Sequence, residues 1–223
     1  MLFRSQNPGK NGNYAFGGAR ARSGNGNSPP DSGTQILMYL GDYGSASPDA
    51  LYVIQFGGND LRDALVAAQT DVNIAFFIIQ TAVQELVANI QMLYVAGARN
   101  FLVANAPNLA HAPAVKLSGA SGVAGLFTGF FNGGLEGGLQ QLELAIPDIN
   151  IIRLDIAGFT DDVVANPGDF GLTDTDFPCL IFFTESDAKC NNPEDHLFWD
   201  GLHPTAAGHN ALSAVATELV NGN

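Results

Sequence analysis

Three short apolar segments recur along the chain, and long segments of helical periodicity separate them. The apolar segments are residues 51–56 (LYVIQF), 100–105 (NFLVAN) and 150–156 (NIIRLDI). Runs this short and this rich in β-branched or aromatic residues are typical of strands buried in a parallel sheet. Strands that alternate with helices predict an α/β fold, a three-layer α/β/α sandwich with helices on both faces of a parallel sheet.

The strongest predicted helix covers residues 71–96, where apolar residues recur at spacings of three and four. Residues 121–146 show the same spacing diluted by glycines, and residues 205–220 predict a final amphipathic helix. Residues 14–16 predict a short strand between loops, and residues 36–40 a short helix. Neither an internal repeat nor a linker divides the sequence, so residues 1–223 are expected to form one domain.

The charge balance argues against some classes of partner. The chain carries 22 acidic and 9 basic residues, for a formal net charge of −13. Such a chain repels phosphate backbones and anionic lipid surfaces, so a nucleic-acid partner is not expected. No run reaches the roughly 18 apolar residues that a membrane span needs, so no span is expected either.

The two cysteines, Cys179 and Cys190, lie eleven positions apart in a segment that reads as a loop. They could form a disulfide, remain free thiols, or join histidines at a metal, although two cysteines alone are too few for structural zinc. A disulfide would indicate an oxidising compartment.

Asp200 and His203 stand on either side of Gly201-Leu202, directly before Pro204 and the last predicted helix. A carboxylate three residues before a histidine on a tight turn can bind the imidazole Nδ1 and leave Nε2 free as a general base. A plainer interpretation makes Asp200 a helix cap and His203 an exposed loop residue. The pair alone does not choose between them.

Two glycine pairs complete the pattern. Gly57-Gly58-Asn59-Asp60 follows the first predicted strand, where the Asn59 side chain could donate to a developing oxyanion or simply cap a helix. Gly17-Gly18 ends the segment NYAFGG and could offer a bare backbone N–H to the same oxyanion, or serve only as a turn.

The ordered set NYAFGGARA, FGGND and FWDGLHPTAAGH resembles three of the sequence blocks of the SGNH/GDSL hydrolases, which have a flavodoxin-like fold. The resemblance implies that Gly18, or Gly17, and Asn59 donate to the oxyanion, that His203 is the base and that Asp200 orients it. These residues are then expected to converge at one rim of the sheet. The cysteine pair before the last block resembles secreted members, which implies a disulfide and a secreted or periplasmic location.

The resemblance lacks its first block, a Gly-Asp-Ser-Leu-like turn whose serine is the family's nucleophile. The residues before Asn13 read as a polar loop, so the first strand and helix of the fold are expected to be missing, and the natural start of the chain to lie upstream of Met1. Alternatively Ser23, Ser28 or Ser32 reaches His203, or His203 activates water directly.

The expected function is therefore carboxylic ester hydrolysis without a cofactor, on a small-molecule or lipid ester. Phe76, Phe77, Phe127, Phe130 and Phe131 could line an acyl pocket, or belong to the core. An inactive or binding-only module that has lost its nucleophile is the alternative. A metal-dependent hydrolase built on His203, Asp200 and His196 lacks a further ligand with convincing spacing, so no metal site is expected.

Overall fold

The computed structural model describes residues 12–24, 29–180 and 189–222. The chain forms two compact units. The first unit contains residues 1–106 and 129–153, and the second contains residues 107–128 and 154–223. The expectation of a single domain stays a prediction.

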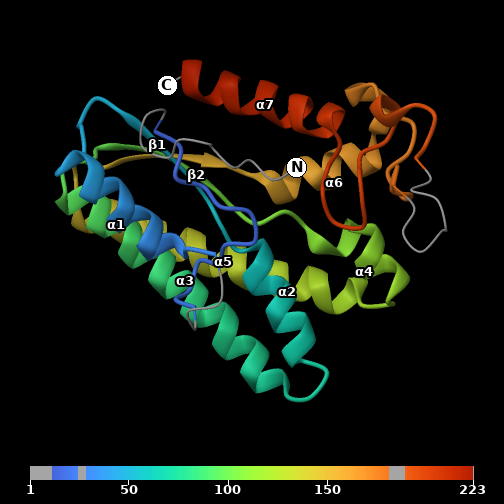
Figure 1. Ribbon diagram of the computed structural model, residues 1–223, viewed down its shortest axis with the longest axis horizontal. Coiled ribbons are helices and arrows are strands. Elements are labelled where there is room, and N and C mark those ends of the chain that lie inside the picture. Colours follow the sequence, from blue (N-terminus) through green and yellow to red (C-terminus); the bar gives the residue numbers. More distant parts are fainter. Residues whose placement is uncertain (1–11, 25–28, 181–188, 223) are drawn as a thin grey trace. The chain divides into compact units, whose positions relative to one another are not determined.

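A parallel sheet of three strands lies in the order β1-β2-β3 (Figure 1). The strands are β1 (Leu51–Gln55), β2 (Asn100–Ala104) and β3 (Asn150–Leu154). Leu51 lies opposite Asn100 and Gln55 opposite Ala104, so β1 and β2 are in register along their full length. Helices flank the sheet, which confirms the predicted α/β class.

Strand β1 differs from β2 in its burial and in its strand pairing. Residues Phe101 to Ala104 of β2 are all buried, as expected for a central strand of a parallel sheet. In β1, Leu51 and Val53 on one face are exposed, and within the described residues its outer edge pairs with no strand. The neighbouring Tyr52 instead packs against Tyr39 of α1.

Three helices of the first unit are α1 (Ser32–Tyr43), α2 (Gly58–Ala67) and α3 (Val72–Val95). The aspartates before α1 and α3 start them, because Asp31 accepts a hydrogen bond from the Thr34 backbone N–H and Asp71 accepts one from Asn73. α3 packs against both α1 and α2.

The second unit contains helices and 3-10 turns. They are η1 (Leu109–His111), α4 (Pro113–Leu117), α6 (Ile156–Ala165), η2 (Pro167–Phe170), η3 (Pro193–Asp195) and α7 (Ala206–Asn221). Helix α5 (Ser121–Ala145) begins in residues of the second unit and ends in residues of the first. A small apolar core joins the loop before α7 to α6, through Val163, Leu172, Leu197 and Phe198.

The predicted strand at residues 14–16 is wrong. The segment is irregular, because the Asn13 side chain accepts from the Ala15 N–H and Tyr14 donates to Asp42, so its polar groups bond locally and not to a sheet. Helices α2 and α6 were not predicted. Both begin within three residues of a strand's end, where the strand pattern conceals the start of a helix.

Helix α3 is a weak candidate for a membrane span, so the expectation of no span is not overturned. By length and composition it is apolar enough to cross a membrane, although a helix in the core of a globular protein can pass the same test. The sequence shows no unbroken apolar run because Asn, Gln and Thr residues and the charged Glu85 interrupt it.

Candidate active site

The Asp200 carboxylate forms hydrogen bonds with two later residues of its own turn, Leu202 and His203. Asp200 Oδ1 accepts from the backbone N–H groups of Leu202 at 2.8 Å and His203 at 2.7 Å. The imidazole Nδ1 of His203 lies 3.0 Å from Oδ1 and 2.8 Å from Oδ2. The predicted contact between Asp200 and His203 Nδ1 is therefore present in the structure.

The carboxylate is held ionised and the imidazole is presented to solvent. Burial opposes the charge of Asp200, but the hydrogen bonds from the His203 and Leu202 N–H groups and from the imidazole outweigh it and lower the pKa of Asp200. The His203 side chain is 61% exposed, against 20% for Asp200. Within the described residues, nothing hydrogen-bonds to Nε2, so this nitrogen can accept a proton from a substrate or a nucleophile.

Neighbouring backbone contacts fix this turn. Trp199 donates its N–H to the His203 carbonyl at 2.8 Å, and the Ala114 N–H donates to the Gly201 carbonyl at 2.9 Å. Thr205 then caps α7, with its hydroxyl accepting from the Gly208 N–H. His203 is thus carried on a turn anchored at both ends.

Asn59 lies in the first turn of α2, directly after β1. The helix begins there because Gly57 adopts a φ of +112°, and a Cβ at Gly57 would lie 2.5 Å from the Phe131 ring. The Asn59 side chain donates from Nδ2 to the Ala19 carbonyl at 3.0 Å. Gly18, with a φ of +81°, precedes that carbonyl, so Asn59 and the Gly18 turn belong to one local arrangement.

Asp60 also binds the loop that contains Gly18. Its fully buried carboxylate accepts from the backbone N–H groups of Ala21 at 2.8 Å and Arg22 at 3.4 Å. Burial raises the pKa of Asp60, while these two hydrogen bonds oppose the shift. Arg20 and Arg22 both bind Asp63, one turn further along α2. The loop that contains Gly18 is therefore bonded to α2 through Asn59, Asp60 and Asp63.

The candidate nucleophiles have other partners. The Ser23 hydroxyl donates to Glu85, and the buried Ser32 hydroxyl donates to the Ala21 carbonyl and accepts from Asn89. Ser28 lies outside the described residues. Neither Ser23 nor Ser32 is hydrogen-bonded to a histidine.

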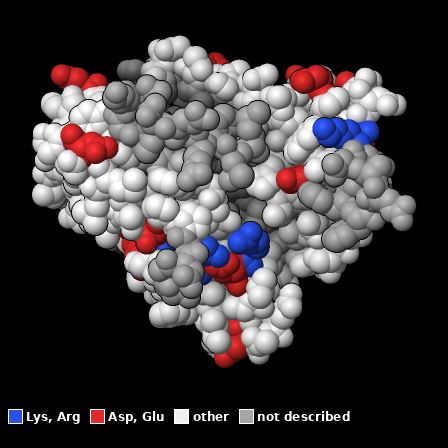
Figure 2. Space-filling view, in the orientation of Figure 1, with Lys and Arg blue, Asp and Glu red and all other residues white. Residues whose placement is uncertain are grey.

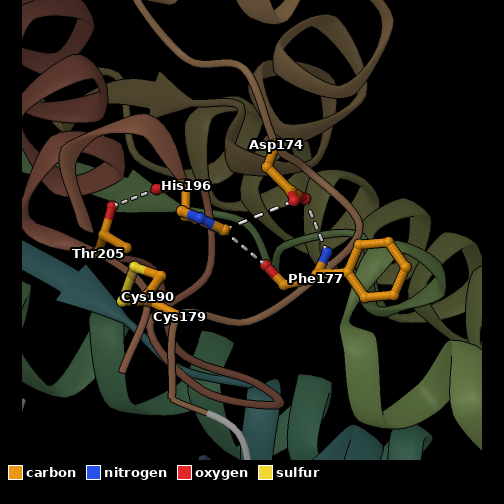
Figure 3. Close-up of a disulfide and its surroundings, with 6 residues drawn as sticks. All are labelled: Asp174, Phe177, Cys179, Cys190, His196 and Thr205. Atoms are coloured by element: carbon orange, nitrogen blue, oxygen red, sulfur yellow. Dashed lines mark hydrogen bonds and ion pairs between the residues drawn. A yellow bond between two sulfur atoms is a disulfide. The ribbon is translucent and has the colours of Figure 1, made fainter. Parts of the chain in front are cut away.

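The disulfide predicted between Cys179 and Cys190 is confirmed (Figure 3). Beside it, His196 Nδ1 lies 3.1 Å from the Phe177 carbonyl and 3.7 Å from Asp174 Oδ2. The His196 carbonyl accepts from the Thr205 hydroxyl. His196 thus links the segment that contains the disulfide to the start of α7.

Sequence reasoning missed a further pair, in which His111 Nε2 lies 2.7 Å from Asp161 Oδ1. Asn108 Nδ2 donates to the same oxygen at 2.8 Å. Fifty positions separate His111 from Asp161, so only the place of Asn108 shortly after a strand could have drawn attention to this cluster. Within the described residues, no group of three His, Cys, Asp or Glu side chains could hold a metal ion.

The structure thus brings Asp200 to His203, and Asn59 to the loop of Gly18. The first pair belongs to the second unit and the other to the first unit. Convergence of all four residues at one rim stays a prediction. Among the phenylalanines, Phe127 and Phe131 belong to the core, whereas Phe77 and Phe130 are exposed.

Comparison with known proteins covers most of the chain. The family model of the GDSL-like lipase/acylhydrolases matches residues 4–215. A GDSL esterase/lipase of Arabidopsis thaliana is 30% identical over 135 residues, which are 55% of this chain and 35% of that protein. An uncharacterized protein from the trpE–trpG intergenic region of Pseudomonas putida is 28% identical over 195 residues, 82% of this chain and 31% of its own length. The chain therefore spans about a third of these curated relatives.

Proposed function

Because this chain belongs to the GDSL-like lipase/acylhydrolase family, whose named relatives are esterases and lipases, we propose that it hydrolyses carboxylic esters of small molecules or lipids. The observation that carries the proposal is the Asp200–His203 pair, with Nδ1 bound to the carboxylate and Nε2 unoccupied among the described residues. The fold alone would not suffice, because α/β folds of this kind host many chemistries.

In the proposed reaction, His203 Nε2 takes the proton of the attacking hydroxyl as its oxygen bonds to the ester carbonyl carbon. The carbonyl oxygen becomes an oxyanion. When the intermediate collapses, the C–O bond to the alcohol breaks and Nε2 returns the proton to the leaving oxygen. Asp200 keeps the tautomer with the proton on Nδ1 and stabilises the imidazolium.

Asn59 and the Gly18 N–H are the proposed donors to the oxyanion. One hydrogen of Asn59 Nδ2 is bound by the Ala19 carbonyl, and the described residues leave the other without a partner. The bonds from Asp60 to the Ala21 and Arg22 N–H groups would keep this loop from moving as charge develops, which is what such stabilisation requires.

The bonds of Ser23 and Ser32 to other partners disfavour both as nucleophiles. We favour a serine on a Gly-Asp-Ser-Leu-like turn at the end of a strand that pairs with the outer edge of β1. The unpaired edge and the exposed Leu51 and Val53 support this, because strands of parallel sheets are normally buried.

The same engaged serines favour one other candidate, a module that binds esters without cleaving them. A further possibility is that His203 activates water, which would hydrolyse the ester without a serine nucleophile. The disulfide supports the further proposal that the protein works in a secreted or periplasmic setting.

Hydrolysis of short-chain p-nitrophenyl esters by this chain, followed by a fluorophosphonate probe and mass spectrometry, tests the proposal. We expect turnover that depends on His203 when the chain is joined to a strand that carries the favoured Gly-Asp-Ser-Leu-like turn, and the mass of the adduct identifies the reacting serine. Turnover without an adduct would indicate water activation. Neither turnover nor an adduct, in a preparation folded by circular dichroism, would favour the binding module for this chain.

A further inference from the structure

The end of the hairpin formed by α2 and α3 carries little charge. Residues 64–84 contain one charged residue, Asp71, in a chain whose formal charge is −13. The two helices meet at residues 68–71, at the end of the hairpin far from the sheet (Figure 1). Figure 2 shows mostly uncharged surface there.

Apolar side chains cover this end, and they face solvent. Val66 at the end of α2 is 62% exposed, and Phe77 in the second turn of α3 is 68% exposed. Val72 and Ile74 lie between them in the chain and are also exposed. These four residues are called the apolar tip below. Exposed apolar side chains that lie near one another can form a surface that contacts something else.

The one charge at the apolar tip is partly satisfied within the chain. Asp71 Oδ1 accepts from the Asn73 backbone N–H at 2.8 Å and from Asn73 Nδ2 at 3.0 Å. These bonds lower the cost of bringing the carboxylate close to an apolar phase. The other polar residues in this stretch are neutral, namely Gln69, Thr70, Asn73, Gln80, Thr81 and Gln84.

We propose that the apolar tip inserts into the surface of electrically neutral lipid. Val66, Val72, Ile74 and Phe77 would enter the boundary between headgroups and acyl chains, while Arg62, exposed one turn before Val66, would reach the phosphates. The net charge of −13 selects zwitterionic lipid over anionic lipid, which it repels.

A second copy of the chain fits this surface less well. It would carry the same charge, so that two copies repel one another at low ionic strength. The composition of α3, which approaches that of a membrane helix, also matches hydrocarbon. The inference extends the proposed function by naming a lipid surface as the place of action, but lipid binding does not require hydrolysis.

The test is flotation of the full chain with vesicles of phosphatidylcholine, alone or mixed with phosphatidylserine. We expect binding to phosphatidylcholine and weaker binding as phosphatidylserine is added. Phe77→Gln and Ile74→Gln should each weaken partitioning about tenfold, because each removes one inserted apolar side chain. The matched control is Val95→Gln, which changes the 77% exposed valine at the other end of α3 and should alter partitioning less than about twofold.

Three results would overturn the inference. They are no flotation with phosphatidylcholine, equal losses in Phe77→Gln and Val95→Gln, or a dimer in light scattering without lipid that Phe77→Gln abolishes. Ester hydrolysis is measured separately on soluble substrate. A chain that binds lipid without turnover would contradict only the proposed function, and turnover without lipid binding would contradict only this inference.

Discussion

Two histidine–aspartate pairs in the second unit use the same residue types for different ends. His203 and Asp200 are three residues apart, and every acceptor bond of the carboxylate goes to its own turn. His196 and Asp174 are 22 positions apart, and Asp174 accepts mainly from the N–H groups of Asp176 and Phe177. His196 gives its ring N–H to a backbone carbonyl instead.

The exposure of the two rings differs as much as their partners. The His196 side chain is 17% exposed, against 61% for His203, and its backbone carbonyl is bonded to Thr205 as well. A half-buried ring that ties two segments together stabilises the fold. A solvent-facing ring oriented through Nδ1 can move protons. Contact between a histidine and an aspartate is therefore poor evidence for catalysis unless the second ring nitrogen is accessible.

The same substitution in both pairs is the strongest test of that difference. His203→Asn keeps an N–H near the position of Nδ1 but removes Nε2, so hydrolysis of p-nitrophenyl esters should fall by roughly 10³–10⁴-fold. His196→Asn should leave kcat nearly unchanged and lower the melting temperature. Full activity in His203→Asn, in protein free of contaminating esterase, would mean that the base is wrongly assigned.

Asn59 should come next in effect. Asn59→Ala removes one of several proposed oxyanion donors, which should lower kcat by about 10²–10³-fold while KM changes little. Asn89→Ala is the matched control, since that side chain bonds to the buried Ser32 hydroxyl and not to the Gly18 loop. A loss in stability without a loss in kcat for Asn59→Ala would show that it only anchors Ala19.

The disulfide, like His196, is expected to stabilise the fold and to take no part in catalysis. Replacing Cys179 and Cys190 by Ser should lower the free energy of unfolding by about 2–4 kcal/mol, because the disulfide reduces the conformational entropy of the unfolded chain. Urea unfolding measures this. Below the unfolding transition, kcat should stay the same. A drop in kcat in the fully folded double variant would mean that the segment containing the disulfide belongs to the catalytic site.

The sequence predicted the three strands and the long helix α3 because burial leaves a periodic pattern that needs no knowledge of neighbours. Helix α2 was missed because its start depends on Gly57 adopting a positive φ beside Phe131, a contact between residues 74 positions apart. The pairing of Asp200 with His203 was predictable for the opposite reason, since three residues and one turn contain it. Glu85 and Asn89, which bind Ser23 and Ser32, lie far along the chain in α3, so no local sequence pattern predicts these bonds.

The smallest expected effect on stability concerns the charge of Asp200. Asp200→Asn keeps an oxygen that can accept from the Leu202 and His203 N–H groups, so the turn should survive and only the charge is lost. Because the pKa of Asp200 is lowered in the folded protein, its ionised form stabilises the fold above the ordinary pKa of about 3.9. That contribution disappears as pH falls through the lowered value.

Urea unfolding of the wild type and Asp200→Asn should therefore differ by less than about 1 kcal/mol near neutral pH, and by progressively less below about pH 4. In a His203→Ala background the backbone donors remain, so part of the difference should persist there. A gap that widens as the solution is acidified would contradict the lowered pKa. A gap that vanishes entirely without His203 would show that the imidazole alone, and not the turn, holds the carboxylate ionised.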